Sequence, residues 1–286
     1  MAKRRISASK VIRLVVVLLC IVGLIALGVH ACRSAVGEEE GPQSSNAGQS
    51  EASSEDTSSV VDPLAKYAEY DDTAYAIDVS QYLSYIEPRS DEYLFLVNPS
   101  HPLAADYVPP DLTDCIHTRQ DGRATQQLRL NAAKALEAFL AEGEALGKVD
   151  NVSVTSAYRS YAYQDYLFNL YCEENMDKFP TREEVEKYVL TFSTRPGTSE
   201  HQSGLCMDMH NLGSANVAFA EKPEAKWLAE NCYRFGFILR YPEDKTEITG
   251  ITYEPWHFRY VGRYHATRMH ELGLCLEEYI EQYAAE

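Results

Sequence analysis

The sequence predicts an α+β domain with a small, mostly antiparallel sheet and flanking helices, preceded by one transmembrane helix and a disordered tether. Three observations lead to this fold class. Helical and strand-like segments follow one another without a regular β-α-β repeat, which disfavours a parallel sheet. Residues 14–31 are almost wholly apolar, whereas residues 33–62 contain almost no large apolar side chain. The whole chain is 45% hydrophobic and 11% aromatic, so it is not a disordered protein throughout.

The apolar run over 14–31 has the composition of a membrane anchor. It contains no charged side chain, and it meets the lower limit of about 17 residues for a spanning helix. Basic residues lie almost all before it, which predicts a cytoplasmic segment over 1–13 and an external location for everything after the span. A cleaved signal peptide is the competing interpretation, and a lipoprotein modified at Cys32 is a third. We favour the uncleaved anchor, because the apolar run exceeds the usual ~7–15 residues of a signal peptide.

Residues 32–62 are predicted to be a disordered linker. They are rich in Ser, Glu, Gly, Asn and Gln, and such a composition cannot bury enough apolar surface to offset the entropy lost on ordering.

The formal net charge of the chain is −17. All charged side chains of residues 1–36 are basic, so the net charge of the rest of the chain is more negative than −17. This excess of acid argues against a general nucleic-acid binder, which needs basic surface to neutralise phosphates.

The globular part begins at about Tyr93, behind a tyrosine- and acid-rich segment over 63–92 that has no clear period. Residues 125–147 place apolar side chains at helical spacing and end on a glycine. Thr181, followed three residues later by Glu184, is typical of a helix N-cap. Further helices are predicted over 160–174, 181–191, 223–235 and about 262–283, and strands over 94–98, 152–159, 237–241 and 251–261.

Seven cysteines are present, and none forms a C-x-x-C pair. A structural zinc site built on cysteine is therefore not expected. An external location permits disulfides, but the spacing does not reveal any pairing among Cys115, Cys172, Cys206, Cys232 and Cys275. Cys206 and Cys232 best fit small buried residues.

His201 and Asp208 are the first candidate pair of metal ligands. On a helix they would lie about 10.5 Å apart along the axis, too far for one metal ion with bonds of ~2 Å. A strand–turn–strand with Ser203 and Gly204 at the bend would bring them together. An aspartate in the apolar strand that follows is costly to bury unless it is paired or bound to a metal.

Glu254 and His257 form a second candidate pair, in an aromatic, strand-like run. His257 can add a nitrogen ligand, while Glu254 can take a proton from a water at the metal and pass it to a leaving amine. Two histidines and one aspartate leave open the fourth position of a catalytic site, and this donor set suits zinc without excluding other divalent ions. Arg159 follows a predicted strand and suits a carboxylate or a developing oxyanion. A surface salt bridge is its alternative role.

Together these segments resemble the VanY-type D-alanyl-D-alanine carboxypeptidases of the bacterial cell wall, zinc peptidases that share a fold with lysostaphin-type enzymes and the Hedgehog signalling domain. The resemblance runs from about Tyr93 to Gly262, through YLFLVN, HPLAADYVP, SAYRSYAYQ, TRPGTSEHQSGLCMD, WLAENCYRFGFILRYP and TGITYEPWHFRYVG. It departs mildly from the family pattern at Cys206, where a small residue is common.

Carried over by position, the resemblance implies one role for each candidate residue. His201, Asp208 and His257 would be the zinc ligands. Glu254 would be the general base and acid, and Arg159 would stabilise the oxyanion. The resemblance also implies that two more residues line the pocket for the peptide end: Gln164 and Ser199.

The resemblance implies a zinc-dependent carboxypeptidase acting on peptidoglycan stem peptides, with residues 93–286 as the catalytic domain and 63–92 as its N-terminal extension. An L,D-carboxypeptidase or a wall endopeptidase remains an alternative, because the sequence does not reveal the shape of the pocket. A non-catalytic, zinc-containing wall-binding module would not need Glu254 or Arg159. A structural zinc would use four ligands rather than three. We expect a monomer, anchored in the cell membrane by a single span, with its catalytic domain on the cell-wall side.

Overall fold

The structure is a computed structural model that describes residue 62 and residues 64–283. The predicted cytoplasmic segment 1–13 and the predicted anchor 14–31 lie outside the described residues, as does the predicted linker apart from Asp62. Within the described part of the chain, no helix is both long enough and apolar enough to cross a membrane. The anchor and the tether therefore stay predictions.

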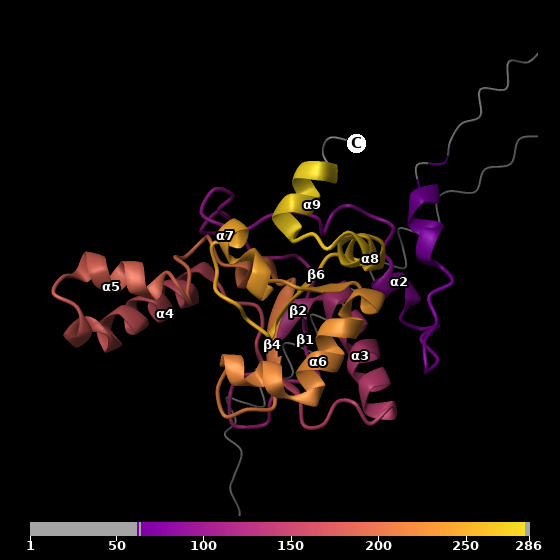
Figure 1. Ribbon diagram of the computed structural model, residues 1–286, viewed down its shortest axis with the longest axis horizontal. Coiled ribbons are helices and arrows are strands. Elements are labelled where there is room, and N and C mark those ends of the chain that lie inside the picture. Colours follow the sequence, from indigo (N-terminus) through magenta and orange to yellow (C-terminus); the bar gives the residue numbers. More distant parts are fainter. Residues whose placement is uncertain (1–61, 63, 284–286) are drawn as a thin grey trace, which may run out of the picture. The chain divides into compact units, whose positions relative to one another are not determined.

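Short strands and helices are mixed along the chain (Figure 1). In chain order, with η marking a 3-10 helix, the described elements are η1 Ala65–Tyr70, α2 Leu83–Ile86, β1 Leu112–Asp114, β2 Gln127–Arg129, α3 Leu130–Ala145, β3 Ser153–Ser156, α4 Tyr161–Glu174, η2 Met176–Lys178, α5 Arg182–Val189, η3 Glu200–Ser203, β4 Cys206–His210, η4 Val217–Glu221, α6 Pro223–Asn231, η5 Cys232–Phe235, β5 Phe237–Leu239, η6 Glu243–Lys245, α7 Thr246–Thr249, β6 His257–Tyr260, α8 Arg263–Leu272 and α9 Leu276–Tyr283.

A four-stranded antiparallel sheet in the order β3-β4-β6-β5 lies at the centre of the domain. β1 and β2 form a separate antiparallel pair. In the larger sheet, Asp208 on β4 lies opposite Ser156 of β3 and His257 of β6. The predicted α+β class with a small antiparallel sheet is confirmed.

The two faces of this sheet have different chemistry, because neighbouring residues of a strand point to opposite faces. Met209 of β4 and Phe258 of β6 are fully buried in the main hydrophobic core, together with the apolar faces of α3 and α6. Asp208 and His257 are their immediate neighbours in sequence. These two side chains therefore lie on the opposite face, where the polar site forms.

Two smaller apolar clusters flank the main core. Ile238 of β5 and Val261 pack with the inner faces of α8 and α9. α4 and α5 contact each other around Phe168 and Val185 and lie side by side at the left of Figure 1. The segment 64–92 contributes to the main core through its own apolar side chains, Val79 and Ile86.

Several predicted boundaries are corrected. The helix predicted over 125–147 begins at Leu130, because β2 runs directly into it and apolar spacing alone does not separate a short strand from a first helical turn. The helix predicted over 262–283 is two helices, because Gly273 adopts φ +67° and ends α8. The other predicted helices and strands after residue 150 are present with shorter bounds.

The strand predicted over 94–98 is wrong, because this segment is not part of a sheet. Its apolar side chains pack inward, but its backbone carbonyls find a different partner. Arg259 Nη2 donates to the carbonyl oxygens of Tyr93 and Phe95, both at 3.0 Å. A buried guanidinium thus replaces the strand neighbour that the sequence pattern predicted.

The strand predicted before the bend at Ser203 and Gly204 is also wrong. His201 lies on the 3-10 helix η3, and the bend itself is confirmed because Gly204 adopts φ +67°. A hydrogen bond from Arg159 N to His201 O, at 3.1 Å, ties η3 to the segment after β3. The compact turn brings His201 back to β4, as the predicted pairing with Asp208 requires.

Candidate active site

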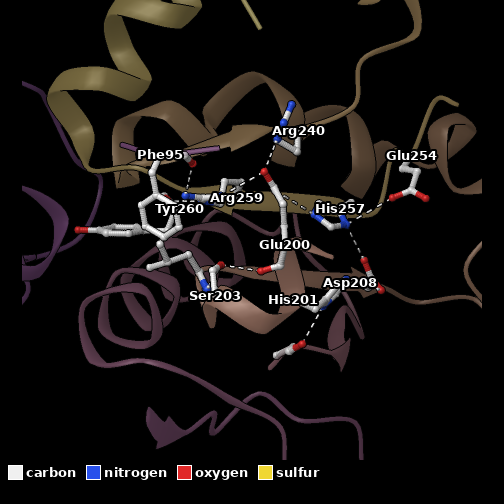
Figure 2. A network of polar contacts seen from close by, with 12 residues as sticks. Phe95, Glu200, His201, Ser203, Asp208, Arg240, Glu254, His257, Arg259 and Tyr260 are labelled. Carbon is white, nitrogen blue, oxygen red and sulfur yellow. Dashed lines mark hydrogen bonds and ion pairs between the residues drawn. The ribbon is translucent and has the colours of Figure 1, made fainter. Parts of the chain in front are cut away.

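Three of the predicted residues, His201, Asp208 and His257, converge on the polar face of the sheet (Figure 2). Asp208 Oδ2 lies 3.5 Å from His201 Nε2, and Asp208 Oδ1 lies 3.2 Å from His257 Nδ1. The two imidazole rings are nearly perpendicular, with centroids 5.0 Å apart. These contacts place the Asp208 carboxylate between the two imidazole rings.

Backbone geometry fixes the orientation of the His201 ring. Its Nδ1 lies 2.7 Å from the carbonyl oxygen of Ala157. Because a carbonyl oxygen can only accept, Nδ1 carries the proton and donates. Nε2 is then the unprotonated nitrogen of the neutral ring, and it faces Asp208. An imidazole anchored through its far N–H in this way is the usual arrangement of a metal-binding histidine.

The donor set fits a divalent metal ion. Asp208 Oδ1 is buried and accepts no hydrogen bond from the described part of the chain. A buried carboxylate facing imidazole nitrogens is costly unless a cation or a proton lies between them. Without metal, burial favours a higher pKa for Asp208, but His201 and His257 hold it well below the usual range. The site is therefore built to keep this carboxylate ionised.

Cys206 is a further candidate ligand, which the sequence analysis had assigned to the buried core. It precedes Asp208 by two residues on β4 and therefore faces the same side of the sheet. Its Sγ and one nitrogen each of His201 and His257 all lie within 4.8 Å of one another. Burial favours a higher pKa for the thiol, but the two imidazoles lower it to about 7. The two-residue spacing between Cys206 and Asp208, which puts both on one face of a strand, was the sequence signal that could have identified Cys206 as a candidate ligand.

Glu254 lies beside the cluster of His201, Asp208 and His257. Its Oε2 is 3.3 Å from His257 Nδ1, and its backbone N–H donates to Tyr241 O at 3.1 Å. With Asp208 and His257 it forms a second group of possible donor atoms within 4.8 Å. A carboxylate at this position can exchange a proton with a water molecule bound at the cluster.

Arg159 approaches the cluster from the segment after β3. Its Nη1 donates to Gln164 Oε1 at 2.8 Å, and Gln164 Nε2 in turn donates to Thr194 O at 2.7 Å. No carboxylate in the part of the chain that the structure describes forms an ion pair with Arg159. The surface salt bridge considered for this residue is therefore absent, and the guanidinium can meet a charge on a ligand.

All seven residues predicted for the site line one cavity of about 60 Å³. They are Arg159, Gln164, Ser199, His201, Asp208, Glu254 and His257. A groove of about 880 Å³ adjoins this cavity and shares two of its lining residues, Arg159 and Asp208. We refer to the two spaces as the catalytic cavity and the large groove.

Sequence reasoning missed Glu200, the buried carboxylate behind His257 (Figure 2). Its Oε1 accepts a hydrogen bond from Arg240 Nε at 2.8 Å and lies 3.1 Å from Arg259 Nη1. Its Oε2 lies 3.7 Å from His257 Nε2. Burial favours a higher pKa for Glu200, but the two guanidinium groups hold it well below the usual range. Glu200 is thus a permanent charge on the far side of the His257 ring, where it can orient that ring.

Comparison with known proteins places the chain in a family. The model of the VanY D-alanyl-D-alanine carboxypeptidase family matches residues 125–263. A solved variant of the vancomycin resistance D,D-pentapeptidase VanY, in complex with Zn(II), is 37% identical with a TM-score of 0.55. That match covers 66% of this chain and 98% of the other. The chain belongs to the VanY D-alanyl-D-alanine carboxypeptidase family.

Other similar proteins extend this picture of the VanY family. The D-alanyl-D-alanine carboxypeptidase of Enterococcus faecalis is 45% identical over 127 residues, which are 44% of this chain and 46% of that enzyme. This chain thus matches about half the length of that relative. The solved structure of the LdcB LD-carboxypeptidase is 35% identical with a TM-score of 0.59, covering 67% of this chain and 86% of that one. The family match over 125–263 includes all seven predicted residues that line the catalytic cavity.

Proposed function

We propose that this chain is a zinc-dependent D-alanyl-D-alanine carboxypeptidase that hydrolyses the terminal peptide bond of peptidoglycan stem peptides. One observation carries the proposal. The catalytic cavity combines two histidines and an aspartate with a further carboxylate, Glu254, and the guanidinium of Arg159, which forms no ion pair with the described residues. A zinc site that only binds or only stabilises the fold has no need of these last two groups.

His201, Asp208 and His257 would hold the zinc ion. When bound there, zinc polarises the peptide carbonyl and lowers the pKa of water. Glu254 accepts the proton of the attacking water at a carboxylate oxygen and then donates it to the nitrogen of the departing D-alanine. Arg159 donates hydrogen bonds to the carbonyl oxygen as negative charge develops on it. Water thus adds its oxygen to the acyl carbon and a proton to the amine.

The sizes of the two spaces support removal of a terminal residue. The catalytic cavity, about 60 Å³, is the smaller of the two spaces and suits a small group such as the side chain and carboxylate of alanine. Gln164 and Ser199 would contact that end of the peptide. The large groove, about 880 Å³, has room for the rest of the stem.

An L,D-carboxypeptidase acting on tetrapeptide stems is the second candidate, supported by the similarity to the LdcB LD-carboxypeptidase. One assay distinguishes the two. The zinc-loaded full chain is incubated with pentapeptide and tetrapeptide stems, and the released amino acids are identified by mass spectrometry. We expect D-alanine from the pentapeptide, and none in the presence of a chelator. Release from the tetrapeptide alone would favour the L,D activity, and release of larger fragments an endopeptidase.

Glu254→Gln tests the assignment of the general base. The variant is expected to retain zinc while kcat falls by about 10²–10⁴, the usual contribution of general acid–base catalysis. Zinc content is measured by elemental mass spectrometry. Cys206→Ala tests the proposed ligand set: if His201, Asp208 and His257 are the ligands, this variant is expected to retain zinc as well. If Glu254→Gln lost its zinc, the residue would belong among the ligands and the assignment would be wrong.

A further inference from the structure

The large groove has a positively charged wall. Arg119, Arg123 and Arg159 line it, and Asp208 is its single acidic lining residue. The chain as a whole has a net charge of −17, and Asp208 already belongs to the proposed metal site. Asp121 balances Arg123, so the positive charge of the groove rests on Arg119 and Arg159, in a protein that is otherwise strongly negative. Such local charge selects an anionic group on a ligand.

Neutral groups hold Arg119 at this wall. Nε donates to Ser153 Oγ at 2.9 Å, Nη1 donates to Leu212 O at 2.7 Å, and Nη2 donates to His210 O. Nη2 also lies 3.2 Å from His210 Nδ1, which accepts a hydrogen bond from Leu212 N. These contacts leave one of the five guanidinium N–H groups, on Nη1, for a ligand. No carboxylate of the described residues lies within ion-pairing distance of Arg119.

The charges around Arg119 leave it unbalanced. Asp121 forms an ion pair with Arg123 at 2.6 Å rather than with Arg119. Burial and the charge of Arg123 both lower the pKa of Arg119, and the nearby charge of Asp121 offsets only part of this effect. An arginine nevertheless stays protonated at neutral pH. A bound carboxylate would relieve this unfavourable state.

The position of Arg119 relative to the metal site indicates which part of a substrate it meets. His210 follows Asp208 by two residues on β4, so the two lie about 7 Å apart on the same face of the sheet. An extended peptide advances ~3.4 Å per residue. A stem peptide that lies along β4, with its scissile carbonyl at the metal site, brings its second or third acyl-side residue to Arg119.

We infer that Arg119 binds a free carboxylate on the acyl side of the scissile bond and selects stems that carry it over stems in which it is amidated. The inference rests on the proposed function. A stem peptide offers such a carboxylate at two places. One is the α-carboxylate of the γ-linked D-glutamate, and the other is the side-chain carboxylate of a diaminopimelate in the third position. Both lie two or three residues before the scissile bond.

Two pairs of synthetic pentapeptides test the inference on the unmodified, zinc-loaded enzyme. In one pair the glutamate α-group is a carboxylate or a carboxamide, with lysine in the third position. In the other pair the same exchange is made on the diaminopimelate side chain, with the glutamate amidated. We expect kcat/KM for D-alanine release to be about tenfold higher or more for the carboxylate in at least one pair, the effect of one charge-assisted contact. The responding pair identifies the carboxylate.

The possible failures can be told apart. Equal kcat/KM within both pairs overturns the inference and leaves the proposed carboxypeptidase intact. No cleavage of any of the four peptides overturns the proposed function instead.

Substitutions at Arg119 test whether this residue causes the preference for a carboxylate over a carboxamide. Arg119→Gln is expected to bring the carboxylate-to-amide ratio of kcat/KM close to one. Arg119→Lys keeps the charge without the planar fork and is expected to give an intermediate ratio; it also remains informative if the glutamine variant does not fold. Lys148→Gln removes one exposed charge outside the groove and is expected to keep the ratio of the unmodified enzyme. An unchanged ratio in both Arg119 variants contradicts the assignment.

Discussion

Glu200 illustrates how the geometry of the site depends on buried charges beside the candidate metal ligands. It lies in a fully buried group with Arg240 and Arg259, and Arg240 is paired in turn with Glu277 of α9 at 2.6 Å. Removing one member of a buried ion pair typically costs about 3–5 kcal/mol, because the remaining charge is left without a partner. The orientation of His257 is thereby linked to the packing of the C-terminal helix.

Arg159 can be tested alone, because its side chain contributes little to the packing. Arg159→Ala is expected to lower kcat/KM by about 10²–10³, the usual effect of removing one oxyanion donor. The side chain is half-buried and its one hydrogen-bonded side-chain partner in the described part of the chain is Gln164, so the fold should persist. Steady-state kinetics and circular dichroism measure the two effects.

Arg159→Lys is the matched variant, since it keeps the charge but loses the planar fork. We expect it to recover only part of the lost rate. Turnover by the alanine variant equal to that of the unmodified enzyme would exclude Arg159 from the stabilisation of the oxyanion.

At the scale of elements, the turn between η3 and β4 brings together the residues of the proposed metal site. Gly204 adopts φ +67°, a conformation that costs other residues about 1–2 kcal/mol. A Cβ at this position would also lie 3.0 Å from Leu112 Cδ2 and 3.3 Å from Arg129 Cγ. The turn therefore requires glycine for two separate reasons, its backbone conformation and its close packing.

Gly204→Ala is expected to lower the free energy of unfolding and to weaken zinc binding, because it shifts His201 relative to Asp208. Gly147→Ala is the matched control: φ is +63° there, and a Cβ would meet no atom within 4 Å. The control should lose only the conformational cost of about 1–2 kcal/mol and should bind zinc normally. Urea denaturation and zinc titration measure both quantities. Identical losses in the two variants would show that packing at Gly204 is irrelevant.

At the scale of the whole domain, a polar cluster joins the segment before residue 93 to the C-terminal helices. His265 Nε2 on α8 lies 2.9 Å from Asp91 Oδ1, and Tyr67 OH donates to the same oxygen at 2.6 Å. Burial lowers the pKa of His265 to about 4, although Asp91 opposes the shift. This histidine is therefore neutral in the folded protein at neutral pH.

The folded domain should lose stability as the pH falls from about 6.5 to about 4. Over this range His265 takes up a proton in the unfolded chain but not in the folded one, so protons favour unfolding. A shift of this size corresponds to about 3 kcal/mol. Urea unfolding of the metal-free protein at several pH values measures the loss, and the absence of metal removes any contribution from zinc release.

His265→Gln cannot titrate, so its stability should depend less steeply on pH over the same range. An equally steep dependence in the variant would assign the effect to other groups.

The charge distribution of the whole chain bears on how a substrate is recognised. An acidic body facing an anionic cell wall, as the predicted anchor over 14–31 would place it, gains nothing from bulk attraction. Recognition then depends on local positive charge at the metal site, at Arg159 and, by our inference, at Arg119. This is consistent with a groove whose lining carries three arginines and one acid.

The sequence alone predicted the fold class and seven of the residues that line the catalytic cavity. It did so because these features are local. Donor chemistry, the glycine at a bend, the N-cap of a helix and alternation along a strand are each visible within a few neighbouring residues. Thr181 does accept from Glu184 N at 3.3 Å, as its spacing predicted.

Only the tertiary structure decided which side chains surround those residues. Glu200 meets Arg240 and Arg259, and Arg259 also satisfies the backbone of the segment predicted as a strand over 94–98. Arg119 meets the far end of β4. Each of these contacts joins segments distant in sequence, and a residue's type says nothing about its partner across such a distance. The local pattern thus specified the chemistry of the site, and the long-range packing of the sheet specified its electrostatic surroundings.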